Sequence, residues 1–133
     1  MKTLVLSLVI LSTSAFAGIQ CPIGTKEAEV CTSTPAAGDQ QIAAEFAKKI
    51  TVCSSVSKSY LIVEPSAAQP QLMPVTAAHR MGGDSYTFDG GDVDLTLDIA
   101  KSVRPTADKS TKGKLNLVFK AAKLKASSTY KCQ

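Results

Sequence analysis

The clearest pattern in the chain is a strict alternation of apolar and polar residues between Asp92 and Ile99. The apolar positions are Val93, Leu95, Leu97 and Ile99, and the polar positions are Asp92, Asp94, Thr96 and Asp98. Successive side chains of a β-strand point to opposite faces, so the pattern predicts a strand with one buried and one exposed face. Lys114 to Lys120 alternates in the same way. Together the two segments predict a hairpin in which a row of aspartates faces a row of lysines.

Shorter stretches of similar character predict further strands. They are Glu27–Thr34, Ile50–Ser54, Tyr60–Glu64, Val75–Met81, Ser85–Phe88 and Leu124–Cys132. We expect a hairpin loop at Ser54–Ser59, a turn at Asp89–Gly91, an irregular crossing at Pro65–Pro74 and a long polar loop at Lys101–Gly113. The fold class predicted is mainly β: a small antiparallel barrel or sandwich of six to eight short strands.

One segment favours a helix, from Asp39 to about Lys49. Ile42, Ala43, Phe46 and Ile50 fall on one helical stripe, and Glu45 precedes Lys49 by four residues. Asp39 is placed to cap the first turn with its carboxylate. The same residues also fit a strand that only Lys48 interrupts, so that alternative stays open.

The first seventeen residues predict an export signal. Lys2 provides a positive start, Leu4–Leu11 is an apolar run of eight residues, and Ala15-Phe16-Ala17 fits a signal-peptidase site. Eight residues are too few to span a bilayer, so we expect cleavage, no membrane insertion afterwards and a periplasmic or extracellular location. Residues 18–133 are then one exported domain. Lipid attachment at Cys21 is disfavoured because bulky Ile19 and Gln20 precede it.

Four cysteines follow the signal, an even number that suits an oxidising compartment and two disulfides. Spacing alone allows three pairings. We favour Cys31–Cys53, joining two early strands, together with Cys21–Cys132, joining the two ends of the mature chain. A zinc site is disfavoured because no Cys-x2-Cys spacing exists and only one histidine is available. No cofactor is expected.

Charge is divided unevenly along the chain. From Gly18 to Ala100 there are five basic and ten acidic residues, whereas from Lys101 onward there are nine basic residues and one acidic residue. Partner binding is therefore most plausible through Lys114, Lys120, Lys123 and Lys125, with an anionic envelope component or an acidic protein as the partner. Nucleic acid is disfavoured because aromatic residues and arginines are scarce there. The simpler interpretation is a solvated lysine face.

Two other parts of the sequence contain side chains that could bind a metal ion or take part in catalysis. Asp89-Gly-Gly-Asp92-Val-Asp94 has the oxygen ligands that calcium prefers, but its spacing is not that of an EF-hand and it does not repeat. His79 is the only histidine, and no Gly-x-Ser-x-Gly motif accompanies it. Neither cluster predicts a site.

The function that we expect is that of a non-catalytic binding or interaction domain, for example an inhibitor or an envelope-associated protein. Two alternatives remain open. One is a hydrolytic enzyme that uses dispersed Asp and Glu residues or His79. The other is a structural component of the cell envelope or surface.

Overall fold

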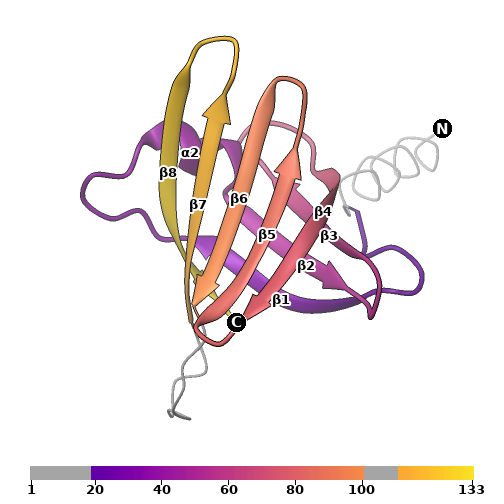
Figure 1. Cartoon of the computed structure of the whole chain (residues 1–133). Coiled ribbons are helices and arrows are strands. Elements are labelled where there is room, and N and C mark those ends of the chain that lie inside the picture. The colour runs from indigo at the N-terminus through magenta and orange to yellow at the C-terminus, as the bar shows by residue number, and fades with distance from the viewer. Residues whose placement is uncertain (1–18, 101–110) are drawn as a thin grey trace, which may run out of the picture.

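The computed structural model describes residues 19–100 and 111–133, and the predicted signal peptide and most of the Lys101–Gly113 loop lie outside this part. The described chain forms a closed antiparallel barrel of eight strands, in which each strand pairs with the next and β8 returns to pair with β1 (Figure 1). The strands are β1 (Lys26–Ser33), β2 (Lys49–Ser54), β3 (Ser59–Glu64), β4 (Gln71–Arg80), β5 (Gly83–Asp89), β6 (Val93–Ala100), β7 (Thr111–Phe119) and β8 (Leu124–Cys132). The prediction of a small antiparallel β fold is confirmed, and the barrel is chosen over the sandwich.

The alternating segments behave as predicted. Leu95, Leu97 and Ile99 of β6 and Leu115 and Leu117 of β7 are buried in the barrel interior. An eight-stranded barrel has an interior that side chains can fill, and the apolar rows of all eight strands supply this core. The exposed rows meet as expected in two places: Asp98 is the direct cross-strand partner of Lys114, and Lys120 Nζ lies 3.2 Å from Oδ1 of Asp94.

The helix α2 (Gln41–Phe46) is shorter than the predicted one, and Asp39 does not cap it. The Asp39 carboxylate accepts hydrogen bonds from the Ala36 N–H, at 2.7 Å, and from the Thr129 N–H of β8, at 3.0 Å. Both backbone bonds hold the pKa of Asp39 below its ordinary value, the Ala36 bond being the stronger cause. The Asp39 carboxylate therefore stabilises the contact with β8 and does not cap the helix.

This role arises because β1 and β8 pair over only three residues, Cys31–Ser33 with Tyr130–Cys132. Beyond that point the side chain of Gln40 accepts the Ser127 N–H at 2.9 Å, and the Gln40 N–H donates to the Ser127 carbonyl at 3.1 Å. Helix α2 then packs Ala43 into the core beside β8, and Ala47, which directly follows the helix, is buried in the same core. The helix and the segment before it complete the wall where β1 falls short.

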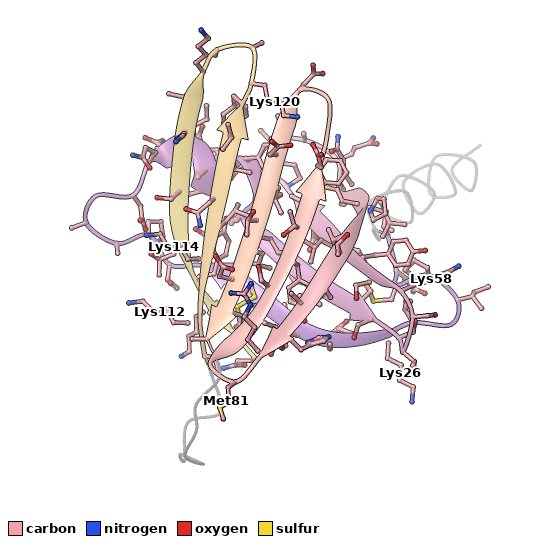
Figure 2. The ribbon with its side chains drawn as sticks, viewed as in Figure 1. Lys26, Lys58, Met81, Lys112, Lys114 and Lys120 are labelled. Carbon is pink, nitrogen blue, oxygen red and sulfur yellow. A yellow bond between two sulfur atoms is a disulfide. The ribbon has the colours of Figure 1, made fainter. Side chains whose placement is uncertain are left out.

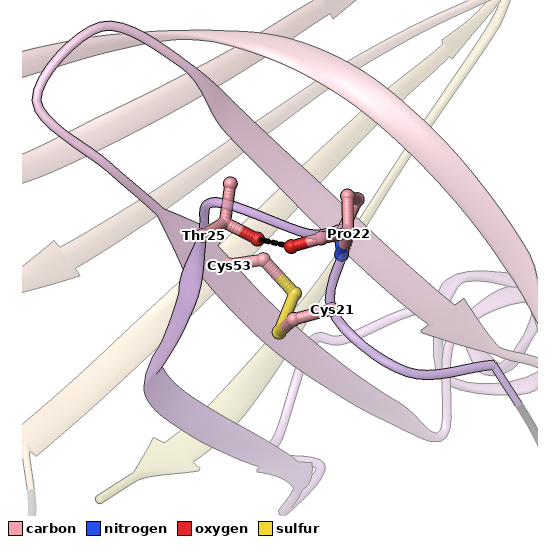
Figure 3. The surroundings of a disulfide bond; sticks show 4 residues. All are labelled: Cys21, Pro22, Thr25 and Cys53. Atoms are coloured by element: carbon pink, nitrogen blue, oxygen red, sulfur yellow. Dashed lines mark hydrogen bonds between the residues drawn. A yellow bond between two sulfur atoms is a disulfide. The ribbon is translucent and has the colours of Figure 1, made fainter.

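The disulfide pairing that we favoured is wrong. The bonds are Cys21–Cys53 and Cys31–Cys132. Cys31 and Cys132 are direct partners across the β1–β8 seam, and both sulfurs lie in the core. Cys53 is fully buried but does not belong to the core cluster, and its bond fastens the segment before β1 to β2 (Figure 3). Only barrel closure brings the last strand to the first, and linear spacing does not reveal it.

Strand β4 begins at Gln71, so the irregular crossing predicted for Pro65–Pro74 is wrong over its last four residues. Residues Gln71–Val75 of β4 pair with β3, whereas Thr76–Arg80 pair with β5. Pro74 therefore has a paired strand on one side only, and a missing N–H is tolerated at such a position. Similarly, β7 begins at Thr111, three residues before the predicted start. The described part of the chain contains no helix long and apolar enough to cross a membrane.

Candidate binding surface

Antiparallel connectivity brings the chain back to the same end of the barrel after every second strand. The starts of β1, β3, β5 and β7 and the ends of β2, β4, β6 and β8 therefore share one end. We call this the basic end, because five exposed cations lie at or next to these strand termini: Lys26, Lys58, Arg80, Lys112 and Lys131. Figure 2 shows Lys26, Lys58 and Lys112 away from Lys120, which lies at the opposite end.

Lys112 of β7 and Lys131 of β8 are direct cross-strand partners, and both are exposed. Like charges directly opposite one another destabilise a sheet. On its other side Lys131 faces Thr32 of β1, which carries no charge. Within residues 19–100 and 111–133, neither lysine takes part in an ion pair. No ion pair among the described residues therefore offsets the repulsion between the two lysines.

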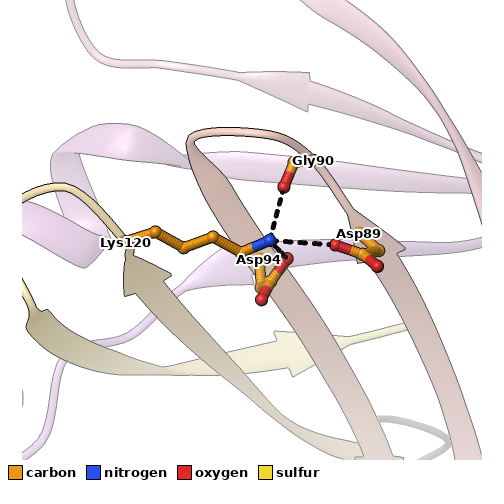
Figure 4. Close-up of polar contacts among 4 residues, drawn as sticks. All are labelled: Asp89, Gly90, Asp94 and Lys120. Atoms are coloured by element: carbon orange, nitrogen blue, oxygen red, sulfur yellow. Dashed lines mark hydrogen bonds and ion pairs between the residues drawn. The ribbon is translucent and has the colours of Figure 1, made fainter.

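At the other end of the barrel, a pair of like charges is neutralised by a side chain of opposite charge. Asp89 and Asp94 are also direct cross-strand partners of like charge. Lys120 Nζ lies 3.2 Å from an oxygen of each carboxylate and donates to the Gly90 carbonyl oxygen at 2.9 Å (Figure 4). Hydrogen bonds to Asp89 and then to Asp94 raise the pKa of Lys120, and hydrogen bonding with Asp94 and Lys120 lowers the pKa of Asp89. Lys120 is thus engaged within the fold.

The four lysines predicted from sequence do not form one surface. Lys114 lies beside Lys112 on β7, whereas Lys120, Lys123 and Lys125 lie at the far turn of the β7–β8 hairpin. Lys123 adopts a left-handed backbone conformation in that turn, with φ of 52°. Lys112 and Lys131, together with Lys26, Lys58 and Arg80, were not singled out. No local signal could have found them, because strand register and barrel closure bring them to one end.

A groove of about 600 Å³ opens on the outer wall near this end. Its polar side chains come from five strands: Arg80, Asp84, Ser85, Asp98, Lys112, Lys114 and Thr129. Three cations and two hydroxyl groups could bind an anionic group there, and the Asp98 carboxylate could accept a hydrogen bond from a donor on the same ligand. Asp98 also places a negative charge opposite Lys114, which leaves Lys112 as the less compensated cation.

His79 lies at the same end with a partner that sequence did not predict. Its Nδ1 is 2.8 Å from Oδ1 of Asp84, a buried carboxylate. A catalytic triad would add a hydroxyl beside the other ring nitrogen. Ser59 is opposite Val75, four residues along β4 from His79, a separation of about 13 Å at the rise of a strand. Ser85 alternates with Asp84, so it faces the other side of the wall. Neither serine is placed as a nucleophile for His79.

Tyr86 lies behind this pair, its ring edge-on to His79 with centroids 6.5 Å apart. Burial, followed by the negative charges of Asp84 and Glu29, raises the pKa of Tyr86 to about 12. The phenol therefore stays protonated at neutral pH.

The aspartates weighed for calcium are arranged around a cation of the protein itself. Lys120 contacts both Asp89 and Asp94, so its ammonium occupies the position between their carboxylates. No group of three or more histidine, cysteine, aspartate or glutamate side chains in the described residues is arranged to hold a metal ion.

Comparison with known proteins found no matching family model, no similar curated protein and no similar solved structure. The two disulfides indicate an oxidising environment, extracellular or periplasmic.

Proposed function

We propose that this chain is a small exported, non-catalytic binding domain whose basic end recognises an anionic partner in the periplasm or outside the cell. An inhibitor of an acidic protein and an envelope-associated protein are both members of this class. The observation that carries the proposal is the Lys112–Lys131 pair of like charge, which has no ion-pair partner among the residues that the structure describes. Arrangements that cost stability are typical of functional sites.

The alternatives gain less support. A hydrolase based on His79 has the orienting carboxylate of Asp84, but strand register places neither Ser59 nor Ser85 as its nucleophile. A structural envelope component would need a surface for self-association, which a closed barrel does not offer through strand edges.

The test uses residues 18–133 and a fluorescent dextran sulfate as the anionic probe, with affinity measured by anisotropy over a range of salt concentrations. The double variant Lys112→Gln/Lys131→Gln should bind about tenfold more weakly and show a shallower salt dependence. The control Lys123→Gln/Lys125→Gln removes the same charge at the other end and should change affinity less than twofold. Equal losses would mean that net charge alone acts, and the proposal would fail.

A stability measurement on the same proteins separates function from structure. Removing the like-charge pair should raise the melting temperature of the Lys112→Gln/Lys131→Gln variant while its binding falls. A variant that loses both binding and stability would instead identify the two lysines as structural.

A further inference from the structure

Among the residues that the structure describes, three large apolar side chains are almost fully exposed, and all three lie at the basic end. Their exposed fractions are 106% for Ile23, 108% for Val56 and 95% for Met81, whereas the other exposed large apolar residues reach 45% at most. Ile23 precedes β1, Val56 lies between β2 and β3, and Met81 lies between β4 and β5. Figure 2 shows Met81 at the tip of its turn, at the edge of the molecule.

Two of these tips are held rigidly. The Ile23 turn is fastened to β2 by Cys21–Cys53, and Thr25 closes it by donating from its hydroxyl to the Pro22 carbonyl at 2.7 Å (Figure 3). Gly24, with φ of 92°, supplies the left-handed residue that this turn needs. Protein interiors usually receive such side chains, yet here the backbone holds Ile23 in solvent.

The turn that carries Val56 is braced in a similar way. The Ser55 N–H donates to the Lys58 carbonyl at 2.8 Å, and the Lys58 N–H donates to the Ser55 hydroxyl at 3.1 Å. Because the tips are already ordered, little conformational entropy is lost when they bind.

Each tip has a cation within three residues of it in the sequence. Lys26 follows Ile23, Lys58 follows Val56, and Arg80 precedes Met81. Lys112 and Lys131 add charge on the wall nearby. Among the acidic groups described at this end, Glu27 and Asp98 are exposed, and Asp98 lies opposite Lys114. Asp84 is buried and bonded to His79. Apolar tips surrounded by cations match an anionic bilayer, whose phosphates attract the cations and whose acyl boundary accepts the apolar groups.

We propose that the basic end docks on the surface of an anionic lipid bilayer, with Ile23, Val56 and Met81 entering the boundary between headgroups and acyl chains. This inference rests on the proposed function and names its anionic partner as a membrane surface. The expectation of no membrane insertion is thereby changed for these three side chains alone. The three apolar tips lie in separate turns around one rim of the barrel, an arrangement that can contact a planar membrane surface. A protein partner would favour one contiguous apolar patch.

Co-sedimentation with vesicles tests the apolar contacts. Residues 18–133 should bind vesicles of phosphatidylglycerol and phosphatidylcholine at least tenfold more tightly than vesicles of phosphatidylcholine alone. Val56→Ser and Met81→Ser should each weaken binding about threefold to tenfold, since an apolar side chain is lost from the acyl boundary. Leu124→Ser, at the opposite end, is the matched control and should bind as the unchanged protein does. Thermal unfolding confirms that each variant is folded.

A second readout uses the absence of tryptophan from the chain. Val56→Trp introduces a single tryptophan at a tip, and its emission should shift to shorter wavelength with anionic vesicles. Leu124→Trp, at the other end, should show no shift. A shift in neither protein, or in both, contradicts docking through the basic end.

The outcomes also distinguish this inference from the proposed function. One outcome is that the Lys112→Gln/Lys131→Gln variant loses dextran sulfate binding and the unchanged protein does not bind anionic vesicles. The partner is then an acidic macromolecule, and membrane docking is overturned. Vesicle binding that Val56→Ser and Met81→Ser leave unchanged also overturns it, because attraction is then purely electrostatic. Failure to bind either probe overturns both proposals.

Discussion

The hydroxyl of Tyr130 donates a hydrogen bond to the backbone carbonyl of Ala47 inside the barrel. Tyr130 belongs to β8 and is 1% exposed, whereas Ala47 directly follows α2. The bond therefore joins the last strand to the junction between α2 and β2, at the place where β1 no longer pairs with β8. Burial is the main cause that raises the pKa of Tyr130 above its ordinary value, so the hydroxyl is protonated and can donate at neutral pH.

Replacing Tyr130 by Phe should destabilise the protein. The Ala47 carbonyl would lose its donor in a buried position, which costs about 1–3 kcal/mol. Urea unfolding monitored by circular dichroism measures the change. Tyr60→Phe, on a half-buried side chain of β3, is the control and should cost less. Equal costs for the two variants would show that the Tyr130 bond adds little.

The two disulfides should contribute unequally. In the chain-entropy model the Cys31–Cys132 bond, with a sequence separation of 101, contributes about 4.7 kcal/mol, and the Cys21–Cys53 bond, with a separation of 32, contributes about 3.7 kcal/mol. Cys31→Ala/Cys132→Ala also leaves a void in the core, so it should lower the unfolding free energy more than Cys21→Ala/Cys53→Ala does. The opposite order would contradict a role for the seam bond in closing the barrel.

Gly113 should tolerate no side chain while the seam disulfide is present. A Cβ added there would lie 2.8 Å from Sγ of Cys132, closer than van der Waals contact allows. Gly113→Ala should therefore cost about 1–3 kcal/mol. In the Cys31→Ala/Cys132→Ala background most of that cost should disappear, which a double-mutant cycle measures as coupling. Additive effects would place the clash elsewhere.

Asp39 should contribute to the acid limb of the stability profile. Its pKa in the folded protein is lowered, so it contributes stability above its unfolded pKa, and that contribution is lost as pH falls through the folded value. Asp39→Asn keeps an acceptor oxygen but removes the titration. The variant should therefore lose less stability than the unchanged protein between about pH 5 and pH 2. Asp92→Asn, in an exposed turn, is the control. An unchanged acid limb in Asp39→Asn would contradict this assignment.

The strand pattern was predictable because alternation is a local property. Each strand carries its own apolar row, and β6 and β7 show it in eight or nine residues without reference to any neighbour. The helix was harder to predict. A helix of six residues depends on tertiary packing, here of Ala43 in the core. The Asp39 carboxylate, which the sequence offers as a cap, is bonded to β8 instead.

The candidate site was predictable only as a surplus of lysine in the carboxyl third. Lys114 was placed on the correct strand, but Lys120 is held by Asp89 and Asp94. The pair formed by Lys112 and Lys131 depends on the register between β7 and β8, which shifts every side chain to the other face if it slips by one residue.

By itself, the sequence determined the class of fold, most of the strands and the oxidising chemistry of four cysteines, since periodicity and composition are properties of neighbouring residues. Tertiary structure alone decided the disulfide partners, the closure of β8 on β1 and the gathering of apolar tips and cations at one end. These depend on contacts between residues far apart in the chain, such as Cys31 and Cys132, 101 positions from each other. Their free energy is gained only when the barrel closes.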